Sequence, residues 1–135
     1  MDVYRDLILD HYRNPRNFGH LKNPDVVVEE NNISCGDRIV IEIKLYSPFS
    51  LPRRQAGILH SRIKDIRFSG EGCAISQASA SMLTEKVKKL SGKQILSMTL
   101  DDIIEMLGTT LTPSRVKCAL LPLEVIQKGI AKRKQ

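Results

Sequence analysis

The spacing of apolar residues divides the chain into a first part that predicts strands and a second part that predicts helices. Apolar and polar residues alternate over residues 39–46, which is typical of a strand with one buried face. Two further extended segments are predicted, one beginning with Val26–Val28 and one over residues 58–68. A short amphipathic helix over residues 3–12 precedes them and should end near Pro15.

The second part of the chain has apolar residues at helical spacing. Residues 74–90 contain no Gly or Pro and predict one helix, and residues 101–107 predict a shorter one. Thr112 is a suitable N-cap and Pro113 a suitable first residue for a last helix. Pro122 should kink or interrupt that helix, because proline lacks the backbone donor.

Strands followed by helices predict an α+β fold, in which helices pack on one face of a small antiparallel three-stranded sheet. Short connections between the strands favour antiparallel pairing. The length of 135 residues suits one domain with one modest core, so residues 1–135 are predicted to form a single domain.

The formal charge of +6 raises the question of a polyanionic partner. The basic residues are spread along the chain, however, and only three Phe and three Tyr are available to stack on bases. Four basic residues near the end, Lys128, Lys132, Arg133 and Lys134, read as a solvated helix face. An acidic protein is therefore the more favoured partner, and neither nucleic acid nor a membrane is expected.

The role of the cysteines depends on whether the protein lies in a reducing compartment. No apolar run approaches the roughly 20 residues of a membrane-spanning helix, and charged residues occupy the first turn, so a cytoplasmic location is predicted. The chain has three cysteines, which cannot all pair, and reducing conditions disfavour disulfides. Metal binding or thiol chemistry is the leading interpretation of these residues.

Cys35 and Asp37 are the first candidate site residues. In an extended chain, residues two apart point to the same side, so both side chains can reach one point. A carboxylate on the apolar side of a strand needs a cation or a hydrogen-bond partner. Gly36 between them gives the backbone the freedom to bring them together.

Cys73 and Cys118 are the other candidates. Cys73 follows Gly72 at a predicted strand-to-helix junction, where the helix dipole favours an anion and thus the thiolate. Cys118 lies early in the last helix, next to Lys117. A single free cysteine is more often core filler than ligand. The coincidence of two Gly-flanked cysteines and one nearby carboxylate favours a shared site.

Four ordered motifs resemble the IscU and NifU amino-terminal family of iron-sulfur cluster scaffold proteins, including its SufU branch. They are residues 10–17 (DHYRNPRN), residues 35–37 (CGD), residues 72–76 (GCAIS) and residues 115–120 (RVKCAL). The resemblance covers nearly the whole chain. It implies a fold in which Cys35, Asp37, Cys73 and Cys118 converge at one exposed end, and a cysteine desulfurase as the partner that delivers sulfur.

Three departures from the family pattern bear on its branches. Lys117 stands where the IscU type has His, as in SufU-like proteins, and a protonated Lys has no lone pair for a metal. Its ion pairing with Asp37 in a metal-free state is an alternative role. Residues 111–117 replace the IscU-type chaperone motif. Extra residues over 47–61 lie between the first two cysteines, whereas the SufU insertion lies between the second and third.

Three functions remain in competition. The first is an assembly scaffold that accepts sulfur and transiently holds iron or an iron-sulfur cluster on Cys35, Asp37, Cys73 and Cys118, before passing it to apo acceptor proteins. The second is a zinc-dependent sulfur acceptor that activates the desulfurase, with Cys118 as the persulfide acceptor and Zn²⁺ closed by the same four residues. The third is a structural zinc module. The sequence leaves open whether the protein is an enzyme or a carrier.

Two further sequence interpretations concern partners and the remaining polar residues. A frataxin-like protein or a chaperone is an additional candidate partner on the basis of the resemblance. The histidines His11, His20 and His60 lie in no ligand pattern with a cysteine and are interpreted as surface or capping residues. The serines over residues 76–81 should permit close helix packing, and three methionines are interpreted as core filler, namely Met82, Met98 and Met106.

Overall fold

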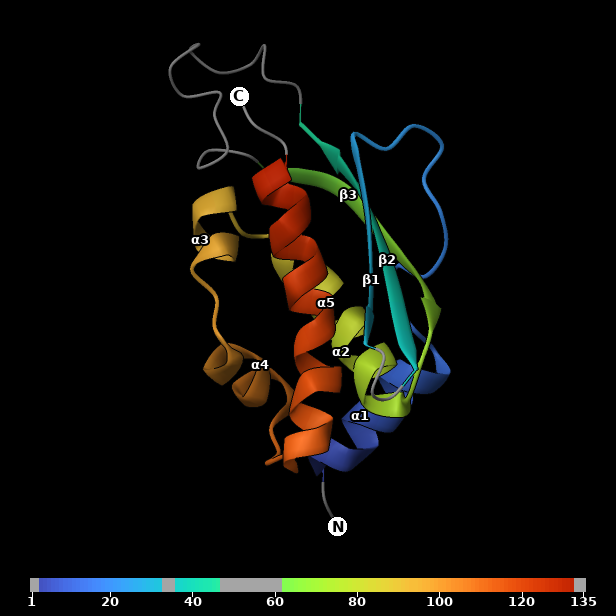
Figure 1. Ribbon diagram of the computed structural model, residues 1–135, viewed down its shortest axis with the longest axis vertical. Helices are drawn as coiled ribbons and strands as arrows, with labels where there is room; N and C mark the ends of the chain where they lie inside the picture. The colour runs from blue at the N-terminus through green and yellow to red at the C-terminus, as the bar shows by residue number, and fades with distance from the viewer. Residues whose placement is uncertain (1–2, 33–35, 47–61, 133–135) are drawn as a thin grey trace.

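The computed structural model describes residues 3–32, 36–46 and 62–132 of the chain. Its elements follow in the order α1 (Val3–Arg13), β1 (Val26–Asn32), β2 (Asp37–Leu45), β3 (Ile63–Glu71), α2 (Ala74–Val87), α3 (Gly92–Leu96), α4 (Leu100–Leu107) and α5 (Pro113–Lys132). The strands form one antiparallel sheet in the order β1-β2-β3. Helices α2 and α5 cover one face of this sheet, and α3 and α4 lie beyond them (Figure 1). The predicted α+β fold is confirmed.

The inner face of the sheet is built by the alternation seen in the sequence. Ile39, Ile41 and Ile43 of β2 are completely buried and face the helices. Helix α5 packs over β1 and β2, and α2 packs over β3, so each strand is covered on this side. Burying each of these side chains stabilises the fold by about 1.5 to 3 kcal/mol before entropy is counted.

Small residues let α2 approach its neighbours closely. Ser79 is fully buried, and its Oγ donates a hydrogen bond of 2.7 Å to the carbonyl oxygen of Ala119 in α5. This agrees with the predicted role of the serines in packing. Met82 of α2 and Leu90, in the turn after it, pack against the core and are only partly buried. Their exposed surface lines a groove that is considered below.

The structure differs from the sequence predictions in two helices. Helix α3 was not predicted; Ser91 caps it by accepting from the amide of Gln94, whose side chain accepts from the amide of Ser91. The sequence predicted a kink or an interruption at Pro122, and helix α5 runs through this residue without interruption. Pro122 is itself buried, and it cannot donate the backbone hydrogen bond of a regular helix.

The segment between α1 and β1 crosses the outer edge of β3 and is tied down by polar contacts. Phe18 forms a bridge with Phe68, and the two rings meet edge to face at 5.3 Å. The buried Ser81 of α2 accepts a hydrogen bond of 2.8 Å from the amide of Arg16 and contacts Nδ1 of His11 at 2.7 Å. We call His11, Arg16 and Ser81 the loop latch.

A buried carboxylate on the outer face of the sheet is held by the same segment. Glu42 accepts from His20 at 2.6 Å and from the amide of Leu21 at 2.9 Å. The alternating pattern predicted a solvent-facing Glu42, and the structure buries it because the loop folds across it. Its two partners remove the cost of burying an unpaired carboxylate.

Candidate metal centre

Asp37 is positioned by the end of the hairpin between β1 and β2. It is the first residue of β2 and pairs with Asn32, the last residue of β1. Gly36 before it has φ of 72°, a left-handed conformation that glycine adopts without strain. The Asp37 side chain shares the inward parity of Ile39 and is only 1% exposed. The hairpin thus places a carboxylate at the end of the apolar face.

Cys73 is positioned at the start of α2, where it is the N-cap residue. Its amide donates a hydrogen bond of 2.9 Å to Oδ1 of Asp37. At the helix terminus that the sequence predicted to favour the Cys73 thiolate, this amide is thus bonded to the Asp37 carboxylate. Oδ2 of Asp37 therefore remains on the side of the Cys73 sulfur, at 3.9 Å.

Gly72 leaves the space in which Asp37 sits. A Cβ at this position would lie 2.4 Å from Oδ1 of Asp37 and 2.6 Å from Oγ of Ser76. Ser76 is itself fixed, since its Oγ donates to the carbonyl oxygen of Cys73 at 3.1 Å. The sequence analysis noted Gly72 only as a neighbour of Cys73. Its close approach to Asp37 joins residues distant in sequence, so no local pattern reveals it.

Cys118 comes to the site from α5. Its side chain is 1% exposed, and its sulfur lies 3.6 Å from the carbonyl oxygen of Ser114. Pro122 stands four residues later and has no N–H to donate to the carbonyl of Cys118. The first turns of α5 thus carry a buried thiol next to a point where the regular helical bonding is modified.

The ligand atoms of Asp37, Cys73 and Cys118 all lie within 4.8 Å of one another. They come from β2, the α2 terminus and α5, which the fold brings to one end of the sheet (Figure 1). Two sulfurs and one carboxylate oxygen suit Zn²⁺ or iron. Ligand atoms around tetrahedral Zn²⁺ lie roughly 3.3 to 3.8 Å apart, given bonds of about 2.0 to 2.3 Å, so a small contraction would close the site.

Other predicted residues are placed as follows. Cys35 lies outside the described residues, as does His60. Lys117 is exposed, whereas Asp37 is buried. His11 and His20 bond to Ser81 and Glu42 respectively, which agrees with the structural roles that the sequence suggested. The described part of the chain therefore brings together three of the four predicted site residues.

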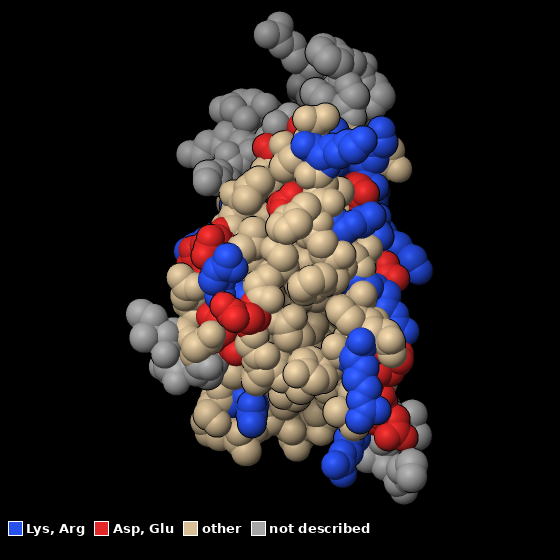
Figure 2. Space-filling model, turned by 90° about the vertical axis from the view of Figure 1, so that its right-hand side faces the viewer, with Lys and Arg blue, Asp and Glu red and all other residues tan. Residues whose placement is uncertain are grey.

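The surface charge is dispersed. On the face in Figure 2, Lys and Arg side chains stand along the margins, with Asp and Glu among them, around an uncharged centre. Several basic residues are paired, for example Arg38 with Glu29 at 2.9 Å and Lys128 with Glu30 at 2.8 Å. Across the described ranges, no helix has the length and apolar character required to cross a membrane.

Comparison with known proteins gives consistent relatives. A model of the family described as NifU-like N terminal domain matches residues 3–135. The chain is 38% identical to the zinc-dependent sulfurtransferase SufU of Bacillus subtilis (strain 168), over 96% of this chain and 90% of that protein. It is 36% identical to the iron-sulfur cluster assembly scaffold protein IscU of Aquifex aeolicus (strain VF5), over 94% and 73%. The same-named protein of Escherichia coli (strain K12) is 34% identical, over 96% and 92%.

Solved structures share the fold. The crystal structure of a hypothetical protein matches with a TM-score of 0.74 and 28% identity, over 96% of this chain and 97% of that one. The putative iron-sulfur cluster assembly scaffold protein for the SUF system from Fervidobacterium islandicum AW-1 matches with a TM-score of 0.71 and 24% identity, over 93% and 94%. The second likeness bears on the fold alone.

Proposed function

This chain belongs to the NifU-like N terminal domain family, and on that premise we propose that it is an iron-sulfur cluster assembly scaffold. It accepts sulfur from a cysteine desulfurase and transiently holds iron or a cluster as its cargo. Cys35, Asp37, Cys73 and Cys118 are the proposed ligands. Apo iron-sulfur proteins are the proposed acceptors.

The observation that supports this function best is the approach of three ligand atoms to within 4.8 Å at the end of the sheet. Asp37 and Cys118 are almost fully buried, so a metal bound to them would be shielded from water on their side. Cys35 is covalently joined to Gly36, the residue before Asp37, and would supply the fourth ligand. A metal would thus be bound by three elements at once.

The donor set suits cargo that must be released. Three thiolates are the soft ligands that iron-sulfur clusters take in proteins, whereas a carboxylate oxygen is a harder ligand. Oδ1 of Asp37 accepts from the amide of Cys73, which orients the carboxylate and draws electron density from it. Asp37 should therefore hold iron less strongly than a fourth cysteine would.

Cys118 is the proposed acceptor of sulfur. Its thiolate would attack the outer sulfur of a persulfide on the desulfurase, and the desulfurase thiolate would leave. The persulfide would then stand on Cys118, whose sulfur lies within 4.8 Å of the ligand atoms of Asp37 and Cys73. A Cys118→Ala variant should lose the stimulation of desulfurase turnover, whereas a Ser114→Ala variant one turn earlier should keep it.

A second candidate function is that of a zinc-dependent sulfur acceptor. It is favoured by the 38% identity to a protein named as a zinc-dependent sulfurtransferase, and by a donor set that would complete a four-ligand zinc site. Here Zn²⁺ would be the resident metal and would lower the pKa of the cysteine thiols bound to it. A structural zinc site is the third alternative.

Anaerobic purification followed by metal and acid-labile sulfide analysis separates the three functions. Iron with sulfide supports the scaffold, zinc with activation of a desulfurase supports the sulfur acceptor, and zinc without activation supports a structural site. In the scaffold, Asp37→Ala should lengthen the lifetime of a reconstituted cluster, and the exposed Asp101→Ala should leave it unchanged. An equal or shorter lifetime in Asp37→Ala would contradict the release role.

Two other parts of the proposal concern organisation and setting. Residues 1–135 are proposed to act as a single domain, since one continuous apolar core extends from Ile8 in α1 to Ile130 in α5. Limited proteolysis should yield no stable smaller fragment. The cytoplasmic location and a frataxin-like or chaperone partner remain predictions, which fractionation and purification of tagged protein can check.

A further inference from the structure

The exposed side of α2 is the floor of a groove between α1 and α4, which we call the α2 groove. One face of α2 contributes Met82, Glu85 and Lys86, which are spaced three and four residues apart, and the turn directly after the helix contributes Lys89 and Leu90. The volume of the groove is about 520 Å³, within the range of about 300 to 1,000 Å³ that is usual for binding sites. No step of the proposed function uses this surface.

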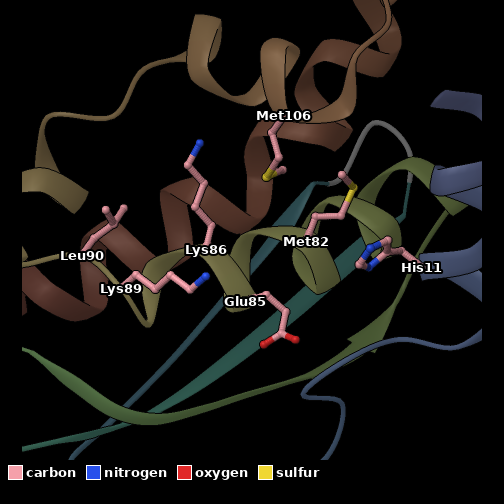
Figure 3. Close-up of a pocket in the computed structure, with 7 residues that line it drawn as sticks. All are labelled: His11, Met82, Glu85, Lys86, Lys89, Leu90 and Met106. Carbon is pink, nitrogen blue, oxygen red and sulfur yellow. The ribbon is translucent and has the colours of Figure 1, made fainter. Parts of the chain in front are cut away.

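The groove has an apolar centre. Three residues pack against the core with one side and remain partly exposed on the other, namely Met82 of α2, Leu90 in the turn after α2 and Met106 of α4. Figure 3 shows Met106 and Met82 on the same side of α2 as Lys86, with Glu85 directed the other way. Methionine side chains adapt to different partner shapes because they are unbranched and polarizable. These residues could thus accept an apolar side chain from outside.

The charge around this centre is positive and available. Glu85 accepts from Asn17 at 3.2 Å and pairs with Lys88 at 3.5 Å, so its charge is engaged. Lys86 and Lys89 are exposed, and none of the ion pairs found in the described part of the chain involves them. Two lysines beside an apolar floor call for an occupant that is apolar and acidic.

We propose that the α2 groove docks an acidic amphipathic helix of a partner protein. The apolar stripe of that helix contacts Met82, Leu90 and Met106, and its Asp or Glu residues reach Lys86 and Lys89. A partner helix of about two to three turns is long enough to contact both the last turns of α2 and the turn that follows it. A second copy of this chain is a poor occupant, since both copies carry a charge of +6.

The position of the groove separates docking from the metal centre. Met82 stands nine residues after Cys73, about 14 Å along the axis of α2. A helix seated on residues 82–90 leaves Cys73 and its neighbours uncovered. The docked partner and a protein that acts on the metal centre can therefore bind at the same time.

The test uses two synthetic helical peptides of about 20 residues. One has a Leu and Met stripe flanked by Glu, and its twin has Lys in place of every Glu. Calorimetry with the full chain should show saturable binding of the acidic peptide with a dissociation constant below about 1 mM, and at least tenfold weaker binding of the basic twin. Affinity for the acidic peptide should fall as salt is raised.

Two charge-reversed variants locate the binding. The double variant Lys86→Glu with Lys89→Glu should bind the acidic peptide at least tenfold more weakly. The matched control, Lys22→Glu with Lys64→Glu, changes the net charge equally at exposed lysines elsewhere and should stay within about threefold of the unmodified chain. All of these side chains are exposed, so neither variant should impair folding.

Each other outcome overturns the proposal. No saturable binding, or equal losses in the two double variants, shows that the groove is not a specific docking site. Self-association in sedimentation that is lost only in Lys86→Glu with Lys89→Glu reassigns the groove to a second copy. Binding of a DNA oligonucleotide with the same sensitivity reassigns it to nucleic acid. Zinc affinity measured with the peptide present should be unchanged, which keeps this test independent of the proposed function.

Discussion

Two polar clusters lie along α2 and differ in how closely their side chains approach one another. At the helix start, 3.9 Å separates the Cys73 sulfur from Oδ2 of Asp37 in the metal centre. Eight residues after Cys73, the loop latch joins Ser81 to His11 and Arg16 at 2.7 and 2.8 Å. Short hydrogen bonds satisfy the latch internally, whereas the centre is spaced for an atom placed between its donors.

This difference teaches how a buried polar group can be read. In both clusters the side chains are held by backbone amides, from Cys73 at the centre and from Arg16 at the latch. The groups of the latch are hydrogen-bonded to one another and stabilise the fold, whereas electron-pair donors that converge at one point, as at the centre, indicate a metal site. Substitutions at the centre should therefore change metal affinity, and substitutions at the latch should change the free energy of unfolding.

Removal of a proposed ligand should have the largest effect. Cys73→Ala and Cys118→Ala should each weaken Zn²⁺ binding more than about 100-fold, since even the partners of metal ligands are worth 10- to 100-fold. Competition with a chromophoric chelator measures this. The exposed Ser97→Ala serves as control and should bind normally. Unchanged affinity in either cysteine variant would remove that residue from the centre.

Crowding of Asp37 should have the next largest effect, without loss of any ligand. Gly72→Ala places a methyl group 2.4 Å from Oδ1 of Asp37, so the carboxylate must move, and Zn²⁺ affinity should fall about 10- to 100-fold. Gly129→Ala is the matched control. Its Cβ would meet only apolar side chains, the nearest at 3.2 Å, so it should alter stability and leave affinity unchanged. Equal affinities in the two variants would contradict the positioning of Asp37.

A substitution in the loop latch should lower the stability of the fold and leave the Zn²⁺ affinity unchanged. Ser81→Ala removes the hydroxyl that accepts from the amide of Arg16 and contacts His11. Leaving buried groups without partners should lower the free energy of unfolding by about 1 to 3 kcal/mol. Urea denaturation measures the loss, with Ser97→Ala again as the exposed control. A tenfold fall in Zn²⁺ affinity in Ser81→Ala would show that latch and centre are not independent.

The residues that the sequence predicted well are those with periodic or local signals. The alternation over residues 39–46 predicted the buried face of β2, and Thr112 with Pro113 predicted the start of α5. The approach of Asp37, Cys73 and Cys118 has no such signal in one stretch of chain. It was inferred from the common side of residues 35 and 37 in an extended chain, from the strand-to-helix junction at Cys73 and from the family resemblance. Contacts between residues far apart in the sequence form only once the elements pack.

The failures have physical causes that only the tertiary structure supplies. Glu42 occupies a polar position in the alternating pattern of β2, yet it is buried because the segment with His20 and Leu21 folds over it. Pro122 does not end α5, since packing outweighs its local cost. Met82 and Met106 were interpreted as core filler, and they pack against the core while remaining partly exposed.

Acidification should have the smallest effect on the free energy of unfolding, and it should act through His11 of the loop latch. Oγ of Ser81 accepts from the amide of Arg16 and lies 2.7 Å from Nδ1 of His11, a ring nitrogen that can accept from the hydroxyl only when it carries no proton. Burial, and then the charge of Arg16, lowers the pKa of His11 below its ordinary value of 6.5, against smaller opposing effects of Asp10 and Glu85. The unfolded chain therefore binds the proton more readily, and stability should fall as the pH drops below 6.5.

His11→Asn keeps an acceptor but does not titrate, so its urea midpoint should change less than that of the unmodified chain between pH 7.5 and pH 5.5. Identical pH responses of the two proteins would show that a proton on His11 does not open the latch.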